Sequence, residues 1–292
     1  MHTYRMKGLV IALLMVGVAT GAFSGIQAQS ESGETHTVAF DGFSFSFASA
    51  LATNVNIVQY PGDPVDLEQP GGPEVRHTEF LLYHEPPAPA PFESPAVIRI
   101  YRTADFPGYA EHETRFQLLR DILSERPDLG LYTAIVVGDD DTDPSFRGRG
   151  RRTSRTTLTE NISLNMLPFL PVLPAGQVIR ARPQYVELPT ITGISYVTVY
   201  RQDVSPFVSN DFLYTFQGLS ADEAYYVSAF SRLTTEVFPT ELPSDFDPEA
   251  FMEQLSEYFA QSVAQLNDAA PDAFTPSLTT LDAMVQSFAF AP

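Results

Sequence analysis

The stretch from Gly176 to Leu233 decides the fold: GQVIRARPQYVELPTITGISYVTVYRQDVSPFVSNDFLYTFQGLSADEAYYVSAFSRL. It holds four runs rich in Val, Ile, Tyr, Phe and Thr, at about 177–188, 194–201, 212–219 and 224–233, and turn-forming residues separate them. Connections this short join antiparallel strands, because a parallel crossover needs a dozen or more residues. We therefore predict an antiparallel meander at the centre of a sheet.

More strands are expected before the meander. Phe43, Phe45 and Phe47 alternate with serines, which is typical of a half-buried strand, and Asp41-Gly42 before them predicts a type I′ hairpin turn. Residues 52–59, 77–84 and 96–102 also have strand composition. Between the last two lies EPPAPAPFESP, which is either a stiff exposed connection or a polyproline recognition segment.

Three helices are predicted from apolar residues at helical spacing. The first covers 109–125, the second covers 248–266 after the N-cap signal Asp247-Pro248, and the third covers 276–286. A short strand at 287–290 is expected to end the chain. The predicted fold is a single α+β domain over 29–292, with helices packed on an antiparallel sheet around a central meander.

The first 28 residues have the pattern of a secretory signal peptide. Arg5 and Lys7 precede an uncharged apolar run from Gly8 to Phe23, and Ala28 is a small residue suited to cleavage. A retained membrane anchor is the alternative, since residues 8–28 are uncharged and nearly long enough to span a bilayer. The chain has no cysteine, which excludes a cysteine-linked lipid, disulfides and thiolate chemistry. We expect a secreted or extracytoplasmic protein of the cell envelope.

The net charge of the mature chain limits the classes of partner that it is expected to bind. Cleavage after Ala28 leaves 15 arginines, no lysine and 36 acidic residues, a net charge of −21. Such an excess of acid disfavours nucleic acid and anionic membrane surfaces as partners. The loss of Lys7, the only lysine, also excludes Schiff-base, pyridoxal-phosphate and P-loop chemistry. We expect no cofactor.

The region 138–165 is polar and is predicted to be a mobile loop. Asp139, Asp141 and Asp143 are spaced like positions 1, 3 and 5 of a calcium-binding EF-hand loop. That loop needs Gly at position 6 and Glu at position 12, where this chain has Pro144 and Gly150. A solvated acidic loop is therefore favoured over a calcium site. The same loop carries a cluster of arginines, which either meets an anionic partner or is neutralised by the aspartates: Arg147, Arg149, Arg151, Arg152 and Arg155.

No catalytic residue is predicted. The four histidines after the leader, His36, His77, His84 and His112, form no HExxH motif and are interpreted as satisfied or exposed single residues and not as zinc ligands. Ser195 is not in a nucleophile elbow, because Val197 replaces the second glycine of that motif.

The meander itself is rich in tyrosine: Tyr196, Tyr200, Tyr214, Tyr225 and Tyr226. One interpretation is a ligand surface or partner interface, for which the candidate binding residues are Tyr200, Arg201, Tyr214 and Gln217. The other is packing between layers, with the hydroxyls reaching water.

Two resemblances follow from these motifs. The run LPFLPVLPAGQV and the later YTFQGL and YYV resemble a pattern of exported bacterial proteins that carry no assigned activity. FDGFSFSF and LDAMVQSFAF resemble the two ends of the PsbP/Mog1-like fold, which implies a sheet sandwiched by helices and used for binding and assembly. The resemblances imply an exported, non-enzymatic module that binds an envelope protein or a small ligand. The alternative is a secreted hydrolase in which two carboxylates converge in a deep pocket.

Overall fold

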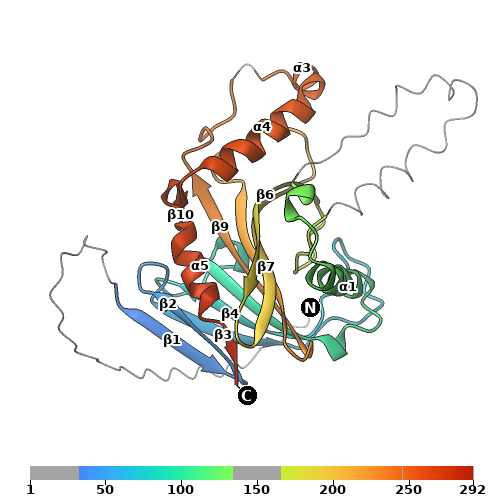
Figure 1. The fold of residues 1–292 in the computed structure, drawn as a ribbon, viewed down its shortest axis with the longest axis vertical. Helices are drawn as coiled ribbons and strands as arrows, with labels where there is room; N and C mark the ends of the chain where they lie inside the picture. Colours follow the sequence, from blue (N-terminus) through green and yellow to red (C-terminus); the bar gives the residue numbers. More distant parts are fainter. Residues whose placement is uncertain (1–32, 134–165, 245, 292) are drawn as a thin grey trace, which may run out of the picture.

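A computed structural model describes residues 33–133, 166–244 and 246–291 (Figure 1). These residues form a mixed α+β fold with two antiparallel sheets. The predicted signal peptide and the whole of the predicted 138–165 loop, with the three aspartates and the arginine cluster, lie outside the described residues.

The predicted meander is confirmed. Its strands are β6 (Gly176–Glu187), β7 (Ile191–Arg201), β8 (Phe212–Ser220) and β9 (Tyr225–Thr235). Each pairs with the next in antiparallel register, and β8 is buried along its whole length. A strand covered on both faces needs apolar residues on both, which accounts for the dense Val, Ile, Phe and Tyr content of the stretch.

Three earlier strands extend the large sheet. They are β3 (Asn54–Tyr60), β4 (His77–Tyr83) and β5 (Ala96–Arg102). The strand order is β3-β4-β5-β9-β8-β7-β6, so that β5 pairs with the last strand of the meander, and the two-residue β10 (Phe274–Thr275) adds to β9. This order places residues of β5 beside residues more than a hundred positions later in the chain.

A smaller sheet joins the two ends of the described chain. β1 (Thr35–Phe40) and β2 (Phe43–Ala48) form the predicted hairpin, and β11 (Ala289–Phe290) pairs with β2. Asp41 and Gly42 both have positive φ, at 51° and 81°, as the type I′ turn requires. Phe43, Phe45 and Phe47 are buried, and this hairpin packs its phenylalanine face on the large sheet through Phe80.

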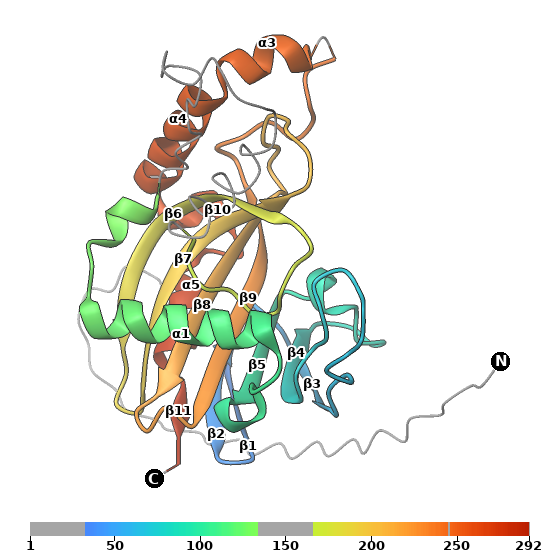
Figure 2. The same ribbon diagram turned by 90° about the vertical axis from the view of Figure 1, so that its right-hand side faces the viewer.

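Helices cover both faces of the large sheet. α4 (Leu255–Asp268) and α5 (Leu278–Gln286) lie on one face with the small sheet, and α1 (Ala110–Glu125) lies on the other (Figures 1 and 2). The single helix predicted for 248–266 is wrong: α3 (Pro248–Glu253) and α4 are separated at Gln254, whose φ of −108° is not helical. Neither Gly nor Pro marks this break, and the local sequence gives no reason for it.

Short 3₁₀ turns complete the described structure, at Pro91–Glu93, Thr103–Asp105, Leu129–Tyr132 and Pro271–Ala273. The third predicted helix starts two residues late, because Ser277 caps it by accepting a hydrogen bond from the Thr280 amide. Within the described ranges, no helix combines the length and the hydrophobicity needed to cross a membrane.

Candidate functional site

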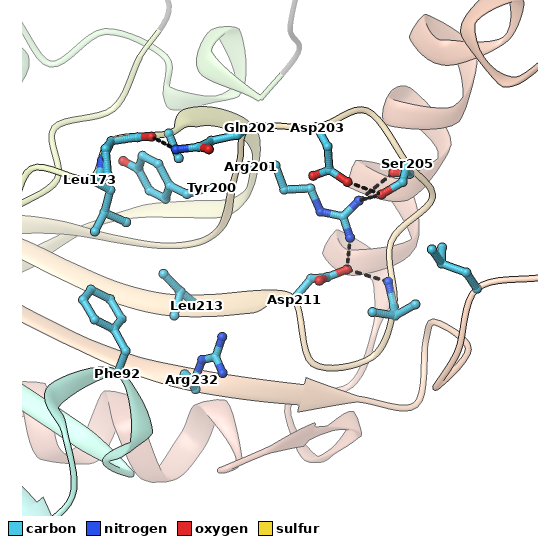
Figure 3. Close-up of a pocket in the computed structure, with 14 residues that line it drawn as sticks. Phe92, Leu173, Tyr200, Arg201, Gln202, Asp203, Ser205, Asp211, Leu213 and Arg232 are labelled. Carbon is cyan, nitrogen blue, oxygen red and sulfur yellow. Dashed lines mark hydrogen bonds and ion pairs between the residues drawn. The ribbon is translucent and has the colours of Figure 1, made fainter. Parts of the chain in front are cut away.

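Two of the four predicted binding residues meet at one end of the sheet. Tyr200 and Arg201 end β7 and line a groove of about 630 Å³, which we call the sheet-end groove (Figure 3). Phe92, Leu173, Leu213 and Leu242 supply its apolar wall. Arg232 of β9 is the register partner of Leu213 in the β8–β9 ladder and also lines the groove.

The two arginines of the groove differ in their partners. The Arg201 guanidinium donates to the Ser205 carbonyl at 2.7 Å and pairs with Asp211, so its charge is used to hold the β7–β8 loop. Arg232 is exposed, and its side chain makes no ion pair or hydrogen bond with any described residue. Arg232 is therefore the cation of the groove that is available to a ligand, and the sequence interpretation missed it.

Tyr214 does not reach the groove. It is paired with Val197 across the β7–β8 ladder, and Tyr200 is three residues beyond Val197, so that the two tyrosines point to opposite faces of the sheet. Tyr214 is buried against α5, where its hydroxyl donates to Asp282 at 2.8 Å. Burial raises the pKa of Tyr214 well above its ordinary value, and burial also raises the pKa of Asp282.

Gln217 is fully buried beneath residues 167–172, a segment that crosses the sheet and that we call the strap. Its Oε1 accepts hydrogen bonds from the Leu170 amide at 3.1 Å and the Tyr226 hydroxyl at 2.8 Å. Its Nε2 donates to Thr215 at 2.8 Å and Ser228 at 3.0 Å. All of its hydrogen bonds are internal, so Gln217 positions the strap.

Other polar residues of the same face hold the strap in the same way. The Gln177 side chain accepts from the Leu167 amide at 3.0 Å, and the Tyr196 hydroxyl donates to the Pro168 carbonyl at 2.6 Å. The Tyr196 hydroxyl thus bonds to a backbone carbonyl of the strap and the Tyr226 hydroxyl to the Gln217 side chain, whereas the packing interpretation expected hydroxyls that reach water. The residues of the LPFLP, YTFQGL and YYV motifs are joined in one hydrogen-bonded unit.

A second cavity, of about 390 Å³, lies on the same face over β3, β4 and β5. We call it the acidic pocket. Its polar lining comes from these strands and from the loop 61–76, and consists of Tyr60, Asp63, Glu74, His77, Glu79 and Arg99, with Gln69 at its edge. Among these residues only His77 is considered above, as a satisfied or exposed single histidine.

Glu74 is the centre of the charged network at this pocket. Its Oε1 accepts from His112 Nε2 at 3.2 Å, and its Oε2 lies 3.4 Å from Arg99. His77 Nδ1 is 3.8 Å from Glu74, so His77 and His112 both lie beside one carboxylate, a grouping that their sequence positions did not indicate. On its other side, Arg99 Nε donates to Glu79 at 2.8 Å.

These contacts determine whether Glu74, Asp63 and His77 are charged at neutral pH. Burial would raise the pKa of Glu74, but the hydrogen bond from His112 and the charge of Arg99 outweigh it and hold the pKa below its ordinary value. Burial also opposes ionisation of Asp63, yet hydrogen bonds from Tyr60 and the Glu74 amide lower its pKa. Burial and the nearby Arg99 lower the pKa of His77. At neutral pH, Glu74 and Asp63 are therefore ionised and His77 is neutral.

The Tyr60 hydroxyl donates to Asp63 at 2.5 Å, which together with burial raises the pKa of Tyr60 to about 12. Glu79 and Arg99 face each other directly across the β4–β5 ladder. That pairing is a signal the sequence contains, but an eleven-residue connection leaves the register of the two strands open. In the ranges that the structure describes, no group of His, Asp and Glu has the arrangement of a metal site.

Comparison of the chain with protein-family models, with curated proteins and with solved structures found no match in any of the three. The geometry of the two cavities is therefore the basis for a functional conclusion.

Proposed function

We propose that the protein is an exported binding or assembly module of the bacterial cell envelope and that it binds its partner in the sheet-end groove. The observation that carries the proposal is Arg232, whose side chain pairs with no described residue, beside an apolar wall. A ligand suited to this groove presents an aliphatic or aromatic group next to a carboxylate. An exposed segment of an envelope protein has this chemistry, and so does a small amphipathic acid.

Anchoring residues of interfaces are typically aromatic or arginine. The groove provides both kinds, since Tyr200 and Phe92 border it and Arg232 supplies the charge. The groove wall is also well supported. Phe92 stacks on Phe230 with ring centroids 4.9 Å apart, and Arg201 fixes the loop beside it. A wall held in this way loses little conformational entropy when a partner binds.

The competing proposal is a secreted hydrolase that uses the carboxylates of the acidic pocket. Glu74 and Glu79 do converge there, but they converge on the guanidinium of Arg99. General acid catalysis needs a carboxyl group whose pKa is raised toward neutrality, whereas the pKa values of Glu74 and Asp63 are lowered. This arrangement favours a binding protein over a hydrolase.

The proposal includes the finer architecture suggested by sequence, a PsbP/Mog1-like sandwich. Helices on both faces of a large antiparallel sheet support it, as does the hairpin β1–β2 that joins the C-terminal strand β11. The resemblance to the PsbP/Mog1-like fold supports a binding role but does not identify a ligand.

Affinity capture from envelope extract tests the binding role. The mature wild-type protein is expected to retain a specific partner, and Arg232→Glu should reduce its recovery at least tenfold, because an acidic ligand would then meet a like charge. Arg102→Glu makes the same charge change at another exposed arginine, outside the groove, and should retain the partner. If the two variants lose the partner to the same extent, or both retain it, the partner does not bind in the groove.

Export is tested separately by fractionation and N-terminal sequencing. We expect a soluble extracytoplasmic species that begins near Gln29. A membrane-bound species that still begins at Met1 would show the retained anchor instead.

A further inference from the structure

The acidic pocket contains a neutral base whose free nitrogen has no partner. His77 is 6% exposed and lines the pocket, and its Nδ1 lies 2.8 Å from the Val75 carbonyl. A carbonyl oxygen can only accept a hydrogen bond, so Nδ1 carries the proton and Nε2 carries a lone pair. Nε2 makes no hydrogen bond within the described part of the chain. Nε2 is not one of the enclosed polar atoms that lack a partner among the described residues, so it is open to the pocket, where a bound group can donate to it.

The charges around His77 favour a cation as that donor. Asp63, Glu74 and Glu79 line the pocket, and Arg99 is the single guanidinium among them. Arg99 is already shared between Glu74 and Glu79, which leaves an excess of negative charge in a largely buried space. A partly buried charge excess of this kind attracts a counter-ion more strongly than an exposed one.

The donor geometry distinguishes between kinds of cation. A guanidinium or alkylammonium ion offers N–H groups that can donate to His77 Nε2 and to a carboxylate at once. The Tyr60 ring lines the pocket beside the His77 ring, with centroids 5.1 Å apart, and adds an aromatic surface near the site. The cavity, at about 390 Å³, is also larger than a bare metal ion needs.

We propose that the acidic pocket is a binding site for a monovalent organic cation, held by His77 Nε2 and the carboxylate of Glu79. The site is separate from the sheet-end groove and does not depend on the function proposed for that groove. The cation is either a free small molecule or the side chain of a partner's arginine, and these two sources share the chemistry of the bound group.

Calorimetric titration of the mature protein with ethylguanidinium, and with uncharged ethylurea of nearly the same shape, tests the charge requirement. Ethylguanidinium should bind at least tenfold more tightly than ethylurea. Glu79→Gln keeps an oxygen that can accept from Arg99 but removes the charge, and should weaken ethylguanidinium binding at least tenfold. Glu68→Gln removes an exposed charge from the 61–76 loop, outside the pocket, and should change binding less than twofold.

Nitrogen NMR of the histidine side chains in the wild-type protein gives a readout that needs no variant. Ethylguanidinium should shift the His77 Nε2 resonance and leave that of the exposed His84 unchanged. Titration with N-acetylarginine amide distinguishes the source: if it also shifts His77, a peptide side chain fits, and if only ethylguanidinium does, the ligand is a free cation. The proposal would be overturned if ethylurea bound as tightly as ethylguanidinium, or if Glu79→Gln left the affinity for ethylguanidinium unchanged. It would also be overturned if ethylguanidinium did not shift the His77 Nε2 resonance.

Discussion

Gln217 shows how one residue can couple distant parts of this chain. Its amide group bonds to the strap through Leu170 and to the sheet through Tyr226, Thr215 and Ser228. A buried amide with both ends satisfied contributes through the groups it keeps paired as much as through its own bonds. The hydrogen-bonded unit explains why polar residues are present within an otherwise apolar strand.

Gln217→Ala should lower the free energy of unfolding by about 2–4 kcal/mol, because the Leu170 amide and the Tyr226 hydroxyl lose their partner in a dry environment. Urea unfolding followed by circular dichroism measures this. Gln261→Ala removes the same group from an exposed position on α4, where it donates to Glu257, and should cost less than about 0.5 kcal/mol. Similar losses in the two variants would contradict the role given to Gln217.

Among the elements, β7 and β8 each carry a glycine at one ladder position, where Gly193 and Gly218 face each other. A Cβ on Gly193 would lie 2.5 Å from the Gln217 carbonyl oxygen and 2.6 Å from the Phe216 ring. The ring of Phe216 fills the space that a side chain would need, so both glycines are required by packing.

Gly193→Ala should therefore destabilise the protein by about 3 kcal/mol or more, since backbone as well as ring must shift. Gly42→Ala is the matched control. Gly42 has a φ of +81° but no atom within 4 Å of an added Cβ, so this change should cost only about 1 kcal/mol of backbone strain. Thermal unfolding of both variants measures the difference, and a ranking in which Gly42→Ala is the more costly would contradict it.

Elements that depend on local pattern could be predicted from sequence. The meander strands and the Asp41-Gly42 turn follow from nearby residues, and each is confirmed. The pairing of β5 with β9 could not be predicted, because Val97 and Phe230 meet across more than a hundred residues without a local signal. Both cavities depend on that pairing or on loops that cross the sheet. The place of Arg232 in the groove and the contact between His77 and Glu74 could therefore not be predicted from the sequence.

In the whole molecule, both cavities open on the face that carries the strap and α1. The Pro-rich connection predicted between β4 and β5 lies between them, with Pro91 lining the acidic pocket and Phe92 lining the sheet-end groove. Five of the eleven residues of this connection are exposed, while Phe92 is half-buried on Phe230. One face thus presents a groove with a cation, Arg232, and a pocket with an acceptor, His77 Nε2, and neither has a partner in the described part of the chain.

Photo-crosslinking from a single position tests the binding role of the sheet-end groove most directly. Leu242 lines the groove and is 45% exposed, and a photoreactive residue there should crosslink to the partner in envelope extract. The same residue at Leu131, which is 71% exposed and outside the groove, should give no such adduct. The account predicts that Arg232→Glu abolishes the adduct at position 242. Equal adducts from both positions, or an adduct that survives Arg232→Glu, would contradict it.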